Sequence, residues 1–149
     1  MKSQTKLTLC AVAFIVLQCA IVVFCADSIR PDPTLTPGVV RTLTQAQVCS
    51  TKWGLDRRYV TEAMKVQVAK NYGIDRKTIV ARGKGPCCEI DHKVPRELAG
   101  ADDVKNLWAQ PWSSATLKDA EENQYHKDVC SGKISLTAAQ LYFMHWGEK

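Results

Sequence analysis

The chain of 149 residues is poor in histidine, with three, and it has no pair of cysteines separated by two residues. Structural zinc sites usually combine such C-x2-C pairs with further cysteine or histidine ligands, so a zinc finger or zinc ribbon is not expected. The sequence also lacks internal repeats, low-complexity tracts and a region that reads as a second domain. These absences exclude repeat architectures and leave one modest domain.

The N-terminus combines a basic start with a long apolar stretch. Lys2 and Lys6 precede an apolar run over residues 7–26 that only two polar residues interrupt. This pattern is typical of an export signal, although the run approaches the ~20 residues that span a bilayer. Residues 1–26 are therefore expected to be a signal peptide of a secreted or periplasmic protein. The alternative is an uncleaved anchor, through residues 7–26, in the inner membrane.

The charge balance is only mildly positive. The net charge is +5 at pH 7, and it falls to +3 when residues 1–26 are removed, because they contain two lysines and no acids. Such a balance is compatible with binding to nucleic acid and equally with an ordinary solvated surface.

Four cysteines lie outside the signal, namely Cys49, Cys87, Cys88 and Cys130. An even number of cysteines in an exported chain indicates disulfides, and the residues alone leave three pairings open. A bridge between the adjacent Cys87 and Cys88 would distort the peptide bond that joins them.

The first half of the mature chain predicts a linker and two helices. Residues 27–41 carry three prolines without a sustained period and are expected to be a linker. Thr44 begins a short helix with a capping box. Thr61 is expected to cap a longer helix that ends near Tyr72 and Gly73.

The second half predicts a β-hairpin followed by two more helices. A short strand is expected over Cys88–His92, and a returning strand begins near Asn106 and ends at Pro111. A serine or threonine within residues 114–116 is expected to cap the next helix, and Ser135 to begin the last one. The expected fold is α+β, in one domain over residues 42–149.

Asp91 and His92 are the first pair of residues that can carry out hydrolytic chemistry. A neutral imidazole near pH 7 can take a proton from water, which is the role of a general base. A carboxylate is the oxygen ligand that Mg²⁺ prefers. The pair alone does not decide the function, because a hydrogen-bonded structural histidine explains it equally well.

His126 is the second histidine with polar neighbours. Glu122 lies four residues before it and Asn123 three residues before it, so the three can share one face of a helix. A lone histidine on a helix is more often structural than functional. The roles of Glu97 and Glu122, as supports of a site or as surface acids, stay open.

The stretch EIDHKVPRELAGADDVKNLW, residues 89–108, resembles the core of HNH nucleases, the ββα-metal motif. It carries D-H-x-x-P, a glycine turn and N-L. The chain is most similar to small exported bacterial HNH endonucleases, in which K-D-x-x-E-N-x-x-H and V-C-S-G follow this core. Those letters occur here at residues 118–126 and 129–132, and the similarity extends over residues 41–146.

This resemblance implies a metal-dependent endonuclease with a small ββα-metal core and flanking helices. His92 would be the general base, Asp91 a metal ligand, and Asn106 the residue that braces the hairpin and orients the histidine. His126 would be the second metal ligand, with Asn123 as the alternative. The implied cofactor is Mg²⁺ or Mn²⁺, with Zn²⁺ as a further option, and the implied substrate is nucleic acid, with DNA favoured over RNA.

The resemblance also implies a disulfide brace. Many HNH proteins carry zinc-binding C-x2-C pairs that this chain lacks, and a disulfide between Cys49 and Cys130 would take the place of that zinc. Cys87 and Cys88 would then form a bridge with each other, pair with another chain or remain thiols.

Several basic residues near the motif, Arg96, Lys105 and Lys118, are expected to contact substrate phosphates. The segment AQPWSSAT, residues 109–116, is expected to be a loop inserted before the helix that carries His126. The alternative to an enzyme is a non-catalytic exported binding module on the same scaffold. The oligomeric state is left open.

Overall fold

A computed structural model describes residues 30–80 and 87–148. The α-helices are α2 (Gln45–Ser50), α3 (Glu62–Asn71), α4 (Trp112–Cys130) and α5 (Leu136–Met144), and the strands are β1 (Cys88–His92) and β2 (Leu107–Pro111). Single 3-10 turns occur at η1 (Arg76–Thr78), η2 (Arg96–Leu98) and η3 (Val104–Asn106). The predicted α+β class is confirmed, whereas the expected signal or anchor over residues 1–26 lies outside the described residues. No described helix has both the length and the apolar character needed to cross a membrane.

β1 and β2 form an antiparallel hairpin at the centre of the molecule. The predicted strands are confirmed, and their register places Ile90 opposite Ala109. The connecting loop turns sharply at Ala99, which has a positive φ of 67°, and at Gly100. A Cβ on Gly100 would clash with the carbonyl oxygen of Val94, so the close return of the chain requires glycine at this position.

Hydroxyl caps begin the helices as the sequence predicts. The side chains of Thr44, Thr61 and Ser135 each accept a hydrogen bond from the backbone N–H three residues later. Gly73 follows α3 with a φ of 64°, which is the left-handed conformation that favours glycine after a helix. These boundaries are set by local chemistry.

The start of α4 differs from the prediction. Pro111 ends β2 and also precedes the first turn of α4, with no side-chain cap. The expected loop over residues 109–116 and the expected cap within residues 114–116 are therefore wrong. Proline is suited to a position next to the first helical turn, because it lacks an N–H that would otherwise be left without a partner. The hairpin thus runs directly into the helix.

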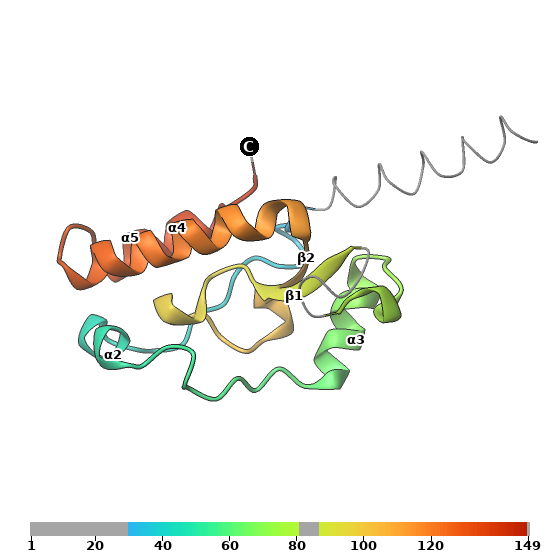
Figure 1. Ribbon diagram of the computed structural model, residues 1–149, viewed down its shortest axis with the longest axis horizontal. Coiled ribbons are helices and arrows are strands. Elements are labelled where there is room, and N and C mark those ends of the chain that lie inside the picture. Colours follow the sequence, from blue (N-terminus) through green and yellow to red (C-terminus); the bar gives the residue numbers. More distant parts are fainter. Residues whose placement is uncertain (1–29, 81–86, 149) are drawn as a thin grey trace, which may run out of the picture.

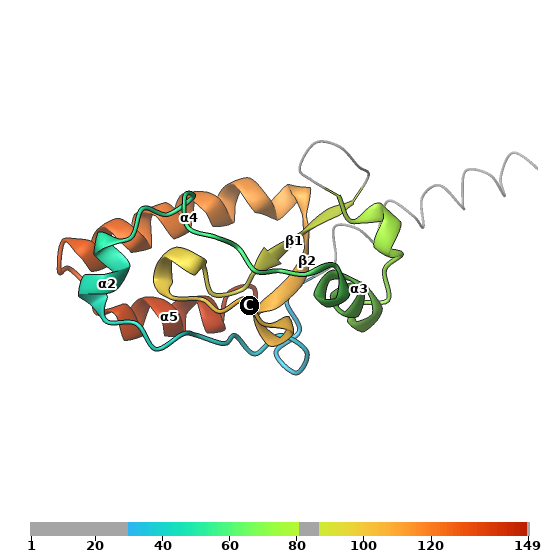
Figure 2. The ribbon, with the colours of Figure 1, turned by 90° about the horizontal axis from the view of Figure 1, so that it is seen from below.

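Two apolar clusters flank the hairpin. One joins α2, the hairpin loop, α4 and α5, and it contains Val48, Leu98, Val129 and Phe143 among its buried members. The other joins α3 to the strands through Val68, Ile79, Ile90 and Leu107. Figures 1 and 2 show α2 with the paired α4 and α5 at one end of the molecule and α3 at the other. Residues 51–61 run beneath the hairpin from α2 to α3.

The described part of the expected linker packs on the domain. Thr36 is fully buried, and its hydroxyl donates a hydrogen bond to the carbonyl oxygen of Leu107 at 3.1 Å. Val40 forms a β-bridge with Gly100. The Arg41 guanidinium donates to the carbonyl oxygen of Gly100 at 3.1 Å, so this segment supports the hairpin loop from outside.

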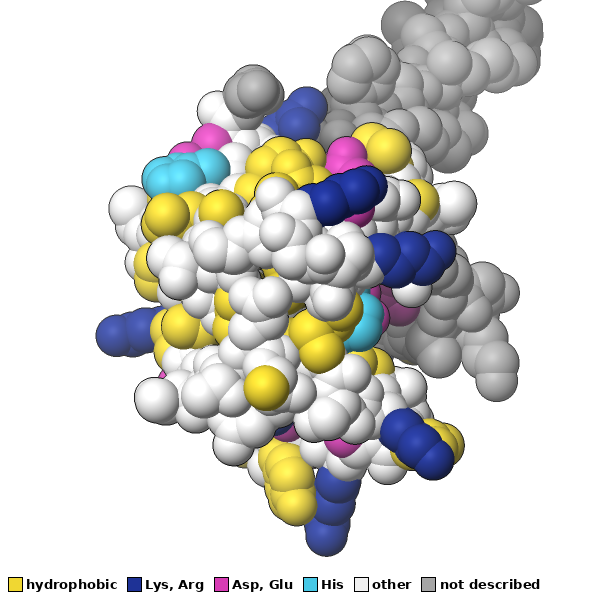
Figure 3. All heavy atoms as spheres, turned by 90° about the vertical axis from the view of Figure 1, so that its left-hand side faces the viewer, with side chains coloured by type: hydrophobic (Ala, Val, Ile, Leu, Met, Phe, Trp, Pro, Cys, Tyr) yellow, Lys and Arg dark blue, Asp and Glu magenta, His cyan; other side chains and the backbone are white. Residues whose placement is uncertain are grey.

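Figure 3 views the end of the molecule where α2 lies beside α4 and α5. Hydrophobic side chains and scattered charges of both signs share this face, and the Lys and Arg side chains lie mainly along its outline. This view does not show a continuous basic patch on the described surface.

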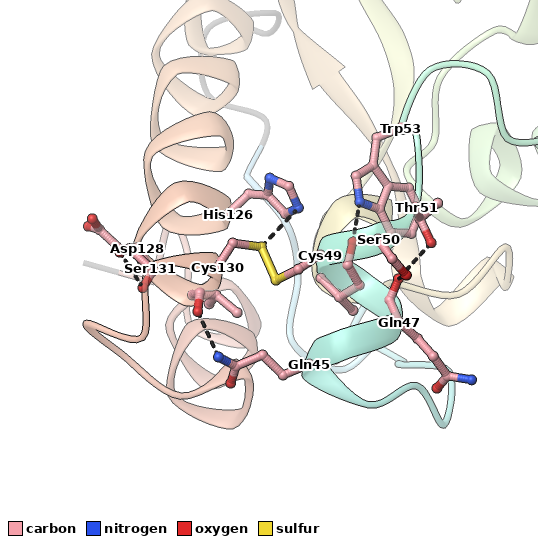
Figure 4. Close-up of a disulfide and its surroundings, with 12 residues drawn as sticks. Gln45, Gln47, Cys49, Ser50, Thr51, Trp53, His126, Asp128, Cys130 and Ser131 are labelled. Atoms are coloured by element: carbon pink, nitrogen blue, oxygen red, sulfur yellow. Dashed lines mark hydrogen bonds between the residues drawn. A yellow bond between two sulfur atoms is a disulfide. The ribbon is translucent and has the colours of Figure 1, made fainter.

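The Cys49–Cys130 disulfide joins α2 to the C-terminal end of α4, with 5.5 Å between the two Cα atoms (Figure 4). This pairing is the one that the resemblance implies. A hydrogen bond of 2.7 Å from Gln45 Nε2 to the carbonyl oxygen of Val129 lies beside it. Cys87 and Cys88 form the second disulfide.

Removing the Cys49–Cys130 bridge should destabilise the domain. We expect the Cys49→Ser/Cys130→Ser double variant to lose about 2–5 kcal/mol of unfolding free energy, because the bridge closes a long loop in the unfolded chain. Urea unfolding without reductant measures the loss. Reductant should lower the unfolding free energy of the wild type nearly to that of the double variant, and it should change the unfolding free energy of the double variant little. Equal stability of the two proteins without reductant would contradict a bracing role.

Candidate functional site

A recess of about 220 Å³ opens at the C-terminal end of β1. Its lining comes from parts of the chain that are far apart in sequence: Trp53, Gly54, Asp56 and Arg58 after α2; Asp91 and His92 on β1; Pro95, Arg96 and Glu97 in the hairpin loop; and Glu122 on α4. The recess therefore brings together the Asp-His pair and Glu122, the glutamate of the K-D-x-x-E-N-x-x-H motif.

A carboxylate fixes the orientation of the His92 imidazole. His92 Nε2 lies 2.7 Å from Oδ1 of Asp102, and the two side chains are only 6% and 15% exposed. The other oxygen of Asp102 accepts a hydrogen bond from the backbone N–H of Tyr59 at 2.6 Å. With Nε2 occupied in this way, Nδ1 is the ring nitrogen that can accept a proton.

The protonation states suit a base. Burial lowers the pKa of His92, and the hydrogen bond to Asp102 offsets this only in part. The same hydrogen bond lowers the pKa of Asp102 to about 2. At neutral pH, Asp102 is therefore ionised and His92 is neutral, with its Nε2–H donated to the carboxylate. This is the form of histidine that can take a proton from water.

Asn106 braces the loop that follows His92. Its Oδ1 accepts from the Val94 N–H at 2.9 Å, and its Nδ2 donates to the carbonyl oxygens of Val94 and Ala101 at 3.0 and 3.1 Å. The resemblance implied that Asn106 also orients the histidine, but the structure assigns the contact with the imidazole to Asp102. Sequence reasoning missed Asp102, because nothing distinguishes it from the other polar residues of its turn.

Lys118 was expected to contact substrate phosphate, which requires a lysine at the surface. The structure instead buries it inside the protein. Its side chain is 0% exposed. The ammonium donates to Asp91 Oδ2 and to the carbonyl oxygen of His92, each at 2.7 Å, and also to Glu122 Oε1. Lys118 thus connects β1 to α4 and holds the backbone of His92.

The charges around Lys118 influence one another strongly. Burial acts to raise the pKa of Asp91, but the Lys118 ammonium holds that pKa below its usual range. Burial and the charge of Asp91 raise the pKa of Glu122 to about 8, despite the nearby ammonium. Burial acts to lower the pKa of Lys118, but Asp91 and Glu122 outweigh this effect and raise that pKa. At neutral pH the cluster is an Asp91–Lys118 ion pair beside a largely protonated Glu122.

Neither of the two expected α4 ligands, His126 and Asn123, is among the residues that line the recess. His126 Nε2 lies 3.6 Å from the Sγ of Cys130, beside the disulfide (Figure 4). Asn123 is exposed, and its side chain donates to the carbonyl oxygen of Asp119 at 2.7 Å. Glu122 is the α4 residue that lines the recess. Within residues 30–80 and 87–148, no three His, Cys, Asp or Glu side chains converge as a metal site.

Glu97 contributes a further carboxylate to the recess. Its Oε1 is buried and has no hydrogen-bond partner in the described part of the chain. Burial raises the pKa of Glu97, and the charges of His126 and Lys118 act in the opposite direction. Asp91, Glu97 and Glu122 therefore place three carboxyl groups on the walls of one recess.

The expected basic contacts are distributed unevenly. Arg96 lines the recess, where its guanidinium pairs with Asp56 and donates to the carbonyl oxygen of Arg57 at 2.8 Å. Lys105 is exposed and does not line the recess. Arg58, which the sequence did not single out, also lines it. Arginine is thus the basic residue type available to a phosphate at this site.

Comparisons with protein-family models, with curated proteins and with solved structures found no match. The resemblance to HNH nucleases therefore depends on the motifs in residues 89–108 and 118–132. The structure adds the order of elements, a two-stranded hairpin that leads directly into a helix.

Replacing Lys118 should destabilise the fold through the charges left behind. We expect Lys118→Met to cost about 3–5 kcal/mol, because Asp91 loses its buried counter-ion. Urea unfolding at pH 7 measures the cost, and the exposed Lys127→Met on the same helix is the control, with a change below about 0.5 kcal/mol. Adding Asp91→Asn and Glu122→Gln to Lys118→Met should recover much of the loss. If Lys118→Met and Lys127→Met both changed the unfolding free energy by a similar small amount, Lys118 would not be the buried counter-ion of Asp91.

Proposed function

We propose that the protein is an HNH-type endonuclease that hydrolyses phosphodiester bonds in nucleic acid, with DNA as the favoured substrate. The observation that carries this proposal is the neutral, buried His92 at the recess, with Nε2 bound to Asp102. Its position at the end of β1, in a hairpin that leads into α4, is the arrangement expected for the base of a ββα nuclease.

In the proposed reaction, a substrate phosphate enters the recess between Arg58 and Arg96. Nδ1 of His92 takes a proton from a water molecule, whose oxygen attacks phosphorus while the bond to the leaving oxygen breaks. Asp102 is a positioning residue that holds the imidazole and stabilises the imidazolium as it forms. Lys118 binds the carbonyl oxygen of His92, and Asn106 binds the backbone of Val94 after it, so both also position the histidine.

The carboxyl groups of the recess are oxygen donors of the type that a hard divalent cation takes, although no three of them converge as a metal site in the described residues. Asp91, Glu97 and Glu122 supply oxygen donors, and the buried Oε1 of Glu97 has no partner among the described residues. His126, one helical turn beyond Glu122, is the nitrogen ligand that the resemblance implies. A bound Mg²⁺ or Mn²⁺ ion would offset phosphate charge and stabilise the leaving oxygen. Such an ion must compete with the Lys118 ammonium for Asp91 and Glu122.

The nuclease proposal is tested by plasmid nicking with the purified protein. We expect cleavage with Mg²⁺ or Mn²⁺, none with EDTA, and recovery when the metal is restored. His92→Ala should reduce the rate by about 10²–10⁴-fold, because it removes the general base. His145→Ala, which changes an exposed histidine, should leave the rate unchanged. A folded wild-type protein that leaves DNA and RNA intact would refute the proposal and favour the non-catalytic binding module.

The pH dependence tests the His92–Asp102 pair separately. Activity requires neutral His92, so kcat/KM should fall as the pH drops through the pKa of His92, with a midpoint below the ordinary value of 6.5. The hydrogen bond from His92 to Asp102 raises that pKa, so Asp102→Asn should move the midpoint to lower pH as well as slow the reaction. Hydrolysis of bis(4-nitrophenyl) phosphate at fixed metal concentration measures both effects.

The control for this pH profile is Asp128→Asn, which changes an aspartate on α4 that pairs with Lys133 away from the recess. Its profile should match that of the wild type. An Asp102→Asn profile with an unchanged midpoint would contradict the role of Asp102 as the partner of the base.

A further inference from the structure

We propose that a second hollow, next to the recess, binds a neighbouring phosphate of the nucleic-acid backbone. This proposal rests on the proposed function in taking nucleic acid as the ligand. The hollow has a volume of about 310 Å³, and it is lined by Arg58, Lys65, Arg76, Ile79, Val80, Glu89 and Ile90. Three cationic side chains and one carboxylate, that of Glu89, thus meet at one concave surface.

The cations come from three elements around the edge of β1. Lys65 lies on α3, Arg76 on η1, and Arg58 in the segment that runs beneath the hairpin. The Arg58 guanidinium donates from Nη2 to the carbonyl oxygen of Ile90 at 2.7 Å. This bond fixes Arg58 against β1, two residues before His92.

Arg58 connects the hollow with the recess, because its side chain lines both. A polymer with regularly repeated phosphates can place one phosphate beside His92 and another in the hollow. A small phosphodiester with one phosphate can occupy only the recess. The two kinds of substrate therefore report on the two sites separately.

The hydrogen bonds of Arg76 leave a donor for an anion. Its Nη1 donates to the carbonyl oxygen of Ile79 at 2.7 Å, and its Nη2 pairs with Glu62. The Nε is buried and finds no partner within the described chain. A buried N–H without an acceptor is unfavourable, and a phosphate oxygen can satisfy it.

Glu62 only partly neutralises this cluster. It lies 2.7 Å from Arg76 and 3.5 Å from Lys65, but its side chain is 63% exposed and therefore well solvated. Among the described residues Lys65 has this one long ion pair, and its side chain is 35% exposed, so its ammonium can turn toward an anion. Phosphate contacts of this kind give binding that weakens as salt is added.

The test compares Lys65→Gln with Lys127→Gln, an exposed lysine on α4. Both are made in a His92→Ala background, and binding of a fluorescent single-stranded DNA 12-mer is followed by anisotropy at several salt concentrations. We expect Lys65→Gln to raise Kd about tenfold at 50 mM salt and to reduce the slope of log Kd against log salt by about 1. Lys127→Gln should change neither quantity, and Lys65→Arg should restore both.

A second measurement uses the same substitution with His92 intact. Lys65→Gln should hydrolyse bis(4-nitrophenyl) phosphate as fast as the wild type, because this substrate does not reach the hollow. Unchanged DNA binding in Lys65→Gln would overturn the second site, whether or not the protein is a nuclease. Failure of the wild type to hydrolyse either substrate would instead refute the proposed function, and the DNA-binding result would still decide the second site.

Discussion

One buried ammonium group connects the parts of the candidate site. Lys118 on α4 binds the Asp91 carboxylate, the backbone carbonyl of His92 and the Glu122 carboxyl group. A charged group without solvent is stable only with such partners, so the end of β1 and the middle of α4 must stay together. The place of the His92 imidazole depends on the backbone carbonyl that Lys118 holds.

Other constraints act on the same histidine from different sides. Asn106 closes the loop after it, and Asp102 fixes the ring. Asp102 in turn accepts a hydrogen bond from the backbone of Tyr59, and Arg58 donates to the backbone of β1. The segment beneath the hairpin thus forms a wall of the recess and also supports Asp102, the partner of His92. A substrate would meet groups that are already held in position.

Local features of the sequence predict much of the fold. Threonine and serine caps, the strand at Cys88–His92 and the glycine after α3 depend on neighbouring residues, so they could be predicted. The start of α4 could not, because Pro111 begins the helix without a hydroxyl cap. The sequence also could not show that Glu122, and not His126, lines the recess. In the sequence Lys118 is one residue of an ordinary polar helix, and only the tertiary fold brings Asp91 to it.

The exposed disulfide has a consequence for when the recess is complete. Cys49 is the penultimate residue of α2. The chain that follows this helix contains Trp53 and Arg58, which form a wall of the recess. Thiols remain reduced in the cytosol, so a chain exported as we propose would lack this tie until it entered an oxidising compartment. If the protein is the exported nuclease that we propose, this wall of the recess would be tied in place only after export.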